Sequence, residues 1–130
     1  MELNELMVSG HIPGCGSMWI GVCREEAGAT LYSAFAADEY TLDRSSRHLT
    51  EDVCGRLFSE LIPLVADPSG GEASDFGSGR RCGLKYRAAG ESAKELLSGE
   101  GFGKDIFTRI AEVLNAYLKD PVVEEFIDIF

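Results

Sequence analysis

The pattern that most constrains the fold is a β-hairpin in the first forty residues. In residues 17–24, "SMWIGVCR", every second residue from Met18 to Val22 is aliphatic. This is the period of a strand with one buried face. Residues 25–28, "EEAG", read as a turn that ends in glycine, and the alternation resumes in residues 29–37, "ATLYSAFAA". The sequence therefore predicts two antiparallel strands joined by a tight turn.

Further segments favour additional strands. Residues 5–12 precede the hairpin, residues 39–43 extend it, and residues 81–90 follow the glycine- and serine-rich loop at 67–80. Residues 91–98 leave two alternatives open. Their propensities favour a short helix, while their place after a strand and a glycine turn favours a hairpin partner.

Two long segments and the C-terminus predict helices. The first starts after Thr50, a good N-cap, and carries apolar residues three and four apart until Pro63 ends or kinks it. The second is residues 104–120, with a broad apolar face. Residues 121–130, "PVVEEFIDIF", form a short acidic amphipathic helix, which either docks on its own domain or is offered to a partner.

These elements predict one α+β domain over residues 1–130. We expect an antiparallel sheet of about four to five strands, with two main helices packed on one face and a short C-terminal helix. The N-terminus does not resemble a secretory signal, and no apolar run is long enough to span a membrane. We therefore expect a cytoplasmic protein that does not bind membranes.

Charge narrows the classes of partner. The chain has 12 basic and 22 acidic residues, a net charge of −10. Nucleic-acid phosphates would repel such a chain, so DNA or RNA binding is not expected. The negative electrostatic potential of such a chain instead attracts a basic protein, so we expect a basic protein partner.

The sequence carries no convincing catalytic or metal-binding motif. Its four cysteines form no C-x-x-C pair, and the "GCGS" turn around Cys15 lacks the spacing and the following helix of a nucleophile elbow. A reactive thiol needs a basic neighbour, and the region around Cys15 is acidic. We expect no enzyme activity, no cofactor and no metal, with chemistry at Cys15 as the least favoured alternative.

The leading hypothesis is a small acidic binding protein that neutralises or inhibits a basic partner. It is similar to toxin-immunity proteins and phage-encoded inhibitors in size, charge and class only, because no motif identifies such a family. The alternative is an adaptor or chaperone-like module, with homodimerisation through the sheet or the terminal helix left open. Aromatic anchors and nearby acids supply the candidate interface residues. They are Trp19, Glu25, Glu26, Tyr32, Asp38, Glu39 and Tyr40.

Overall fold

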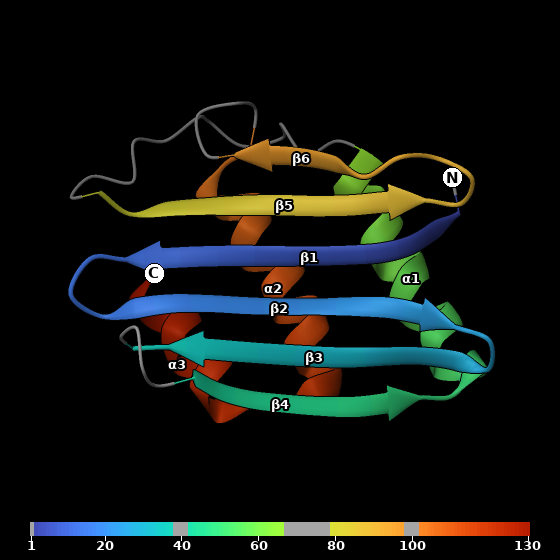
Figure 1. Cartoon of the computed structure of the whole chain (residues 1–130), viewed down its shortest axis with the longest axis horizontal. Helices are drawn as coiled ribbons and strands as arrows, with labels where there is room; N and C mark the ends of the chain where they lie inside the picture. Colours follow the sequence, from blue (N-terminus) through green and yellow to red (C-terminus); the bar gives the residue numbers. More distant parts are fainter. Residues whose placement is uncertain (1, 38–41, 67–78, 98–101) are drawn as a thin grey trace.

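A computed structural model describes residues 2–37, 42–66, 79–97 and 102–130. The chain forms a six-stranded antiparallel sheet with strand order β4-β3-β2-β1-β5-β6 (Figure 1). The strands are β1 (Leu3–Ile12), β2 (Gly16–Glu25), β3 (Gly28–Ala36), β4 (Leu42–Leu49), β5 (Arg81–Ala88) and β6 (Lys94–Leu97). The helices are α1 (Glu51–Ala66), α2 (Lys104–Leu118) and α3 (Pro121–Ile129). The predicted α+β class is confirmed.

The predicted hairpin is formed by β2 and β3, joined by a turn that ends in glycine. Met18 pairs with Phe35 and Val22 with Leu31, so their side chains share one face of the sheet. Gly28 closes the turn with φ 118, and a Cβ atom there would lie 1.9 Å from the carbonyl oxygen of Leu49. Only glycine fits this backbone without strain.

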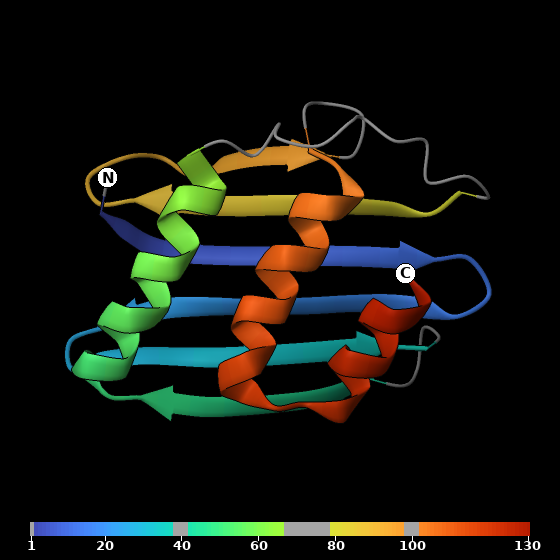
Figure 2. The ribbon, with the colours of Figure 1, turned by 180° about the vertical axis from the view of Figure 1, so that it is seen from behind.

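All three helices cover the same face of the sheet (Figure 2). α2 is the central helix and packs on β1, β2, β3 and β5 as well as on both other helices. The core lies between these two layers, where Phe107 and Ile110 of α2 are fully buried. Gly10 of β1 leaves room for this packing, because a Cβ atom there would come within 2.8 Å of the Phe107 ring. Within the described ranges, no helix lies over the opposite face of the sheet.

The C-terminal helix docks on its own domain. Val123, Phe126 and Phe130 are all buried, and Phe126 packs edge-on against Phe35 of β3. Asp120 caps the helix by accepting a hydrogen bond from the backbone N–H of Val122.

Contacts at both ends of α3 fix its position. The Ser33 hydroxyl donates to Asp120 at 2.6 Å. The Arg80 guanidinium donates to the carbonyls of Ile129 and Phe130 at the other end, where a positive charge favours the helix dipole. The structure thus settles the alternative that the sequence left open.

The structure differs from the sequence prediction at β4 and decides two points that the sequence left open, at Pro63 and in residues 91–98. The strand after the hairpin is β4, residues 42–49, whereas most of the predicted 39–43 segment lies outside the described residues. α1 does not end before Pro63 but continues to Ala66, because Leu61 and Val65 both remain packed in the core. Residues 94–97 form a strand, β6, that pairs with β5, so of the two alternatives for this segment the hairpin partner is confirmed. The sheet therefore has six strands instead of four or five.

Candidate protein-binding surfaces

The uncovered face of the sheet carries an apolar hollow. In β1, β2 and β3 the residues that alternate with the core point to this face, and they include Met7, Trp19 and Tyr32. With Leu42 and Arg44 of β4 they line a hollow of about 580 Å³. Aromatic side chains on an open concave surface are typical anchors of protein interfaces.

Gly21 shapes this hollow by allowing Tyr32 to lie across the neighbouring strand. The two residues are register partners, and a Cβ atom at Gly21 would sit 2.6 Å from the Tyr32 hydroxyl oxygen. Partial burial, with smaller contributions from Glu5 and Cys23, raises the pKa of the Tyr32 phenol. Tyr32 therefore stays protonated at neutral pH and presents a neutral ring to this surface.

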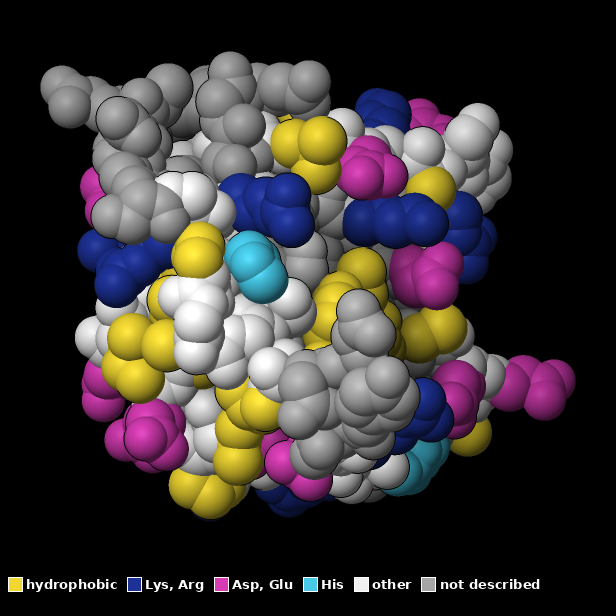
Figure 3. Space-filling model, turned by 60° about the vertical axis from the view of Figure 1, so that its left-hand side comes forward, with side chains coloured by type: hydrophobic (Ala, Val, Ile, Leu, Met, Phe, Trp, Pro, Cys, Tyr) yellow, Lys and Arg dark blue, Asp and Glu magenta, His cyan; other side chains and the backbone are white. Residues whose placement is uncertain are grey.

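The charges next to this hollow are mostly basic. A second hollow shares Met7 and Tyr32 with the first and adds Lys85 and Arg87, with Glu5 as the one acid among its lining residues. Glu5 is already paired, because its carboxylate lies 3.1 Å from Nε of Arg87. Figure 3 shows hydrophobic side chains lying between groups of dark-blue basic side chains in this part of the molecule. The local charge differs in sign from that of the whole chain.

The structure brings together only two of the predicted interface residues, Trp19 and Tyr32. Glu25 lies at the end of β2, where it accepts a hydrogen bond from the Thr30 hydroxyl and lies 3.8 Å from Nδ1 of His48. Glu26 is exposed in the turn that follows. The remaining candidates, Asp38, Glu39 and Tyr40, lie outside the described residues.

Charge is divided between the two layers of the fold. The six strands carry seven basic and four acidic side chains, whereas the three helices carry three basic and eight acidic ones. Among the helices and strands that the structure describes, the helical layer therefore carries the negative charge.

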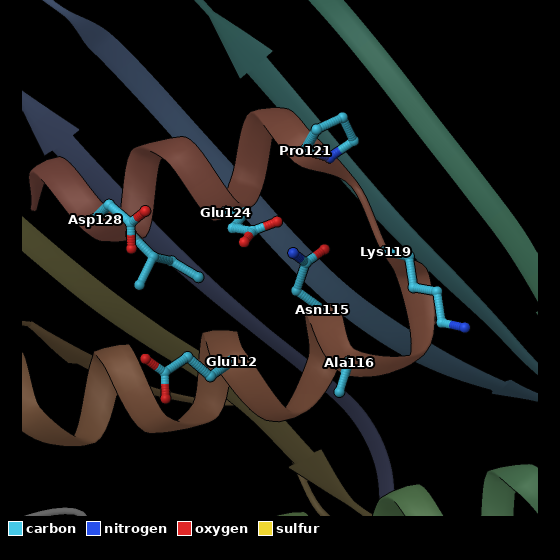
Figure 4. Close-up of a pocket in the computed structure, with 8 residues that line it drawn as sticks. Glu112, Asn115, Ala116, Lys119, Pro121, Glu124 and Asp128 are labelled. Carbon is cyan, nitrogen blue, oxygen red and sulfur yellow. The ribbon is translucent and has the colours of Figure 1, made fainter.

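The helical layer contains an acidic groove between α2 and α3 (Figure 4). Glu112 of α2 and Glu124 and Asp128 of α3 point into the space between the helices, with Ile127 supplying apolar surface. Lys119, at the turn, is the basic residue among those that line the groove. The groove has a volume of about 420 Å³.

Backbone hydrogen bonds hold the two walls of the acidic groove in place. The Asn115 side chain donates to the carbonyl of Asp120 at 3.1 Å and accepts from its N–H at 2.9 Å. Lys119 adopts a left-handed conformation with φ 58, and its N–H bonds to the carbonyl of Asn115. These hydrogen bonds fix the angle between α2 and α3. The backbone positions of the acidic residues on the two helices are therefore fixed relative to one another.

The cysteines and histidines do not assemble a reactive centre among the described residues. Cys15 is exposed at the β1–β2 turn, and His11 near it is hydrogen-bonded to Ser17 at 2.7 Å. Burial, together with Glu5 and Glu25, raises the pKa of the Cys23 thiol, and burial raises that of Cys82 to about 12. Both shifts disfavour the nucleophilic thiolate. In the same part of the chain no three His, Cys, Asp or Glu side chains are placed to share a metal ion.

Several residues of the two candidate surfaces could not be predicted from the sequence. Met7, Leu42 and Arg44 join Trp19 only through the sheet register, and the acidic groove depends on how α3 folds back beside α2. The spacing of Glu124 and Asp128, four residues apart on a predicted helix, was the one local signal for a shared acidic face.

None of the helices in the described ranges is long and apolar enough to span a bilayer. Comparison of the sequence with protein-family models and with curated proteins finds no match.

Proposed function

We propose that this protein is a non-catalytic binding protein that neutralises a basic protein partner by covering the partner's working surface. The observation that carries the proposal is the division of charge between the layers. Eight acidic and three basic side chains make the helices the negative side of the molecule. A surface of one sign raises the rate at which an oppositely charged protein arrives and orients it on arrival.

The acidic groove is the candidate contact site on that surface. Glu112, Glu124 and Asp128 present three carboxylates from two helices whose relative position is fixed. An arginine side chain entering the groove would donate paired hydrogen bonds to a carboxylate. Its aliphatic stem would lie against Ile127. Because Glu112, Glu124 and Asp128 are exposed, each single contact would contribute about 1 kcal/mol or less, and binding depends on several of them acting together.

Affinity capture tests this proposal. The protein is immobilised and incubated with lysate of its source organism at low and at high salt, and the captured proteins are identified by mass spectrometry. We expect one dominant basic partner whose retention falls steeply with salt. Capture of a neutral or acidic partner, or retention that salt does not change, would contradict the proposal.

A matched pair of variants locates the contact. The variant Glu112→Lys/Glu124→Lys/Asp128→Lys reverses the groove charges. The control Glu2→Lys/Glu91→Lys/Glu95→Lys makes the same change in net charge at exposed sites away from the groove. We expect the groove variant to lose the partner and the control to keep most of its affinity. Equal losses would show that net charge alone acts and that the groove is not the contact.

The apolar hollow on the uncovered sheet face favours a second candidate, an adaptor-like module. Its ligand would be an acidic segment with a large apolar side chain, because Trp19 and Met7 form the hollow while Arg44 and Lys85 lie beside it. Trp19 is the only tryptophan of the chain and reports directly on this face. A blue shift of its emission on binding would favour the sheet face, and an unchanged spectrum would favour the helical groove.

A further inference from the structure

The strand β4 ends the sheet on one side and has the features of a pairing edge. It runs for eight residues, Leu42–Leu49, and all but Leu49 are exposed. On its inner side it pairs with β3 along its whole length, and it is the last strand on this side of the sheet among the residues that the structure describes (Figure 1). The outer side of such a strand presents a row of backbone N–H and C=O groups that another strand can complete.

The sequence of β4, "LDRSSRHL", is self-complementary in one antiparallel register. When two copies are aligned about Ser45, Asp43 of each copy stands opposite Arg47 of the other, so the pair occurs twice. In the same register Arg44 stands opposite Ser46, which is uncharged. Opposite charges on directly opposed residues stabilise a strand pair, and like charges destabilise it.

Asp43 and Arg47 also lie on the same face of the sheet. In the register with β3, Asp43 pairs with Phe35 and Arg47 pairs with Leu31, and both partners pack toward the helices. The Arg47 guanidinium is held there, because it donates to the carbonyl of Tyr117 at 2.6 Å. A guanidinium has five N–H donors, so further donors are available for a carboxylate.

Other alignments lose this match. A shift of the register by one residue would place the helices of the two copies on opposite faces of the shared sheet, because side chains alternate between the faces along a strand. One of the two possible one-residue shifts also sets Arg44 opposite Arg47. A shift that centres the pair on Ser46 places Arg44 opposite His48 and removes Arg47 from Asp43. Among these alignments, the register centred on Ser45 is the one that pairs opposite charges while keeping both helical layers on one side.

We propose that two copies of this chain pair through their β4 edges in the register centred on Ser45. The assembly is a two-fold dimer with one continuous sheet of twelve strands, since each copy contributes six. The helices of both copies cover the same face of the shared sheet. The apolar hollows, which β4 borders through Leu42 and Arg44, come together on the other face.

The opposing charges make the test specific. Sedimentation of the full chain over a wide concentration range should show a monomer–dimer equilibrium. In Asp43→Arg both cross-pairs become Arg–Arg, and in Arg47→Asp both become Asp–Asp. Each variant should weaken the dimer by about tenfold or more. A mixture of the two variants restores both opposite-charge pairs, so it should form a heterodimer with an affinity near that of the wild type.

The control is Arg44→Asp, which makes the same charge change as Arg47→Asp on the same strand but opposite Ser46. It should leave the dimer intact. Circular dichroism of each variant checks that the fold is kept, and heterodimer formation on mixing is itself evidence that both chains are folded. A chain that stays monomeric at all concentrations would overturn the proposal. So would a dimer that the single changes do not weaken or that mixing does not restore.

Discussion

Replacing Phe126 with alanine tests the docking of α3, on which one wall of the acidic groove depends. The ring is 4% exposed and packs among Phe35, Phe130 and the space left by Gly10. Removing a buried phenylalanine costs about 3–5 kcal/mol, through lost burial and the cavity left behind. Because typical domains are stable by only about 5–15 kcal/mol, this is a large fraction of the total.

Urea unfolding followed by circular dichroism and by Trp19 fluorescence measures the loss. The matched control is Ile129→Ala in the same helix, because Ile129 is 47% exposed and should cost about 0.5 kcal/mol or less. Hydrogen exchange in α3 of the Phe126→Ala variant shows whether the helix has undocked locally, which would limit the global loss. Equal small losses in the two variants, with α3 still protected, would refute the claim that Phe126 anchors this helix.

Three further outcomes follow from single sites. Gly28→Ala should destabilise the fold by more than about 1 kcal/mol in thermal unfolding, because its φ is 118 and the new Cβ would meet the Leu49 carbonyl; unchanged stability would contradict this. Asp120→Ala should cost about 1–2 kcal/mol by loss of the cap and of the Ser33 contact, and a neutral effect in urea would argue against that cap. Burial raises the pKa of Cys82 from 9.0 to about 12, so above pH 9 the unfolded chain loses the thiol proton before the folded chain does. The free energy of unfolding should therefore be unaffected by this thiol below pH 9 and fall by up to about 1.4 kcal/mol per pH unit between pH 9 and 12. The variant Cys82→Ala should flatten that part of the pH profile, and a profile identical to the wild type would count against the shift.

The parts of the fold with a local periodic signal could be predicted from the sequence. The β2–β3 hairpin follows from alternation and a glycine turn, and α2 follows from apolar residues at helical spacing. β4 has no such signal. Seven of its eight residues are exposed, so it exists as a strand because β3 supplies its hydrogen-bond partners rather than because its pattern demands it.

β6 illustrates tertiary contacts overriding local propensity. Residues 94–97 favour a helix by composition, yet Leu96 pairs with Leu84 of β5 and packs against the core. α1 shows the same effect, because packing of Leu61 and Val65 carries the helix past Pro63. In both cases the deciding partners lie far away in the sequence.

Of the hollow on the sheet face, the sequence predicted only what the residue pattern within one strand determines. Alternation placed Trp19 on the face opposite the core, which the structure confirms. The hollow around Trp19 needs residues from three other strands, and their register is set by turns and bulges that composition does not specify. The acidic groove depends on the turn at Lys119, whose left-handed conformation has no clear signal in the residue itself.

The most direct test of the account is hydrogen exchange of the free protein and of its complex with the captured partner. If the helical layer is the contact, slowed exchange should be concentrated in α2, α3 and the turn between them, around Asn115 and Glu124. The exchange of β2 and β3 should change little. Protection centred on the strands that carry Trp19 and Tyr32, with α2 and α3 unchanged, would contradict the central claim that the acidic helical layer binds the partner.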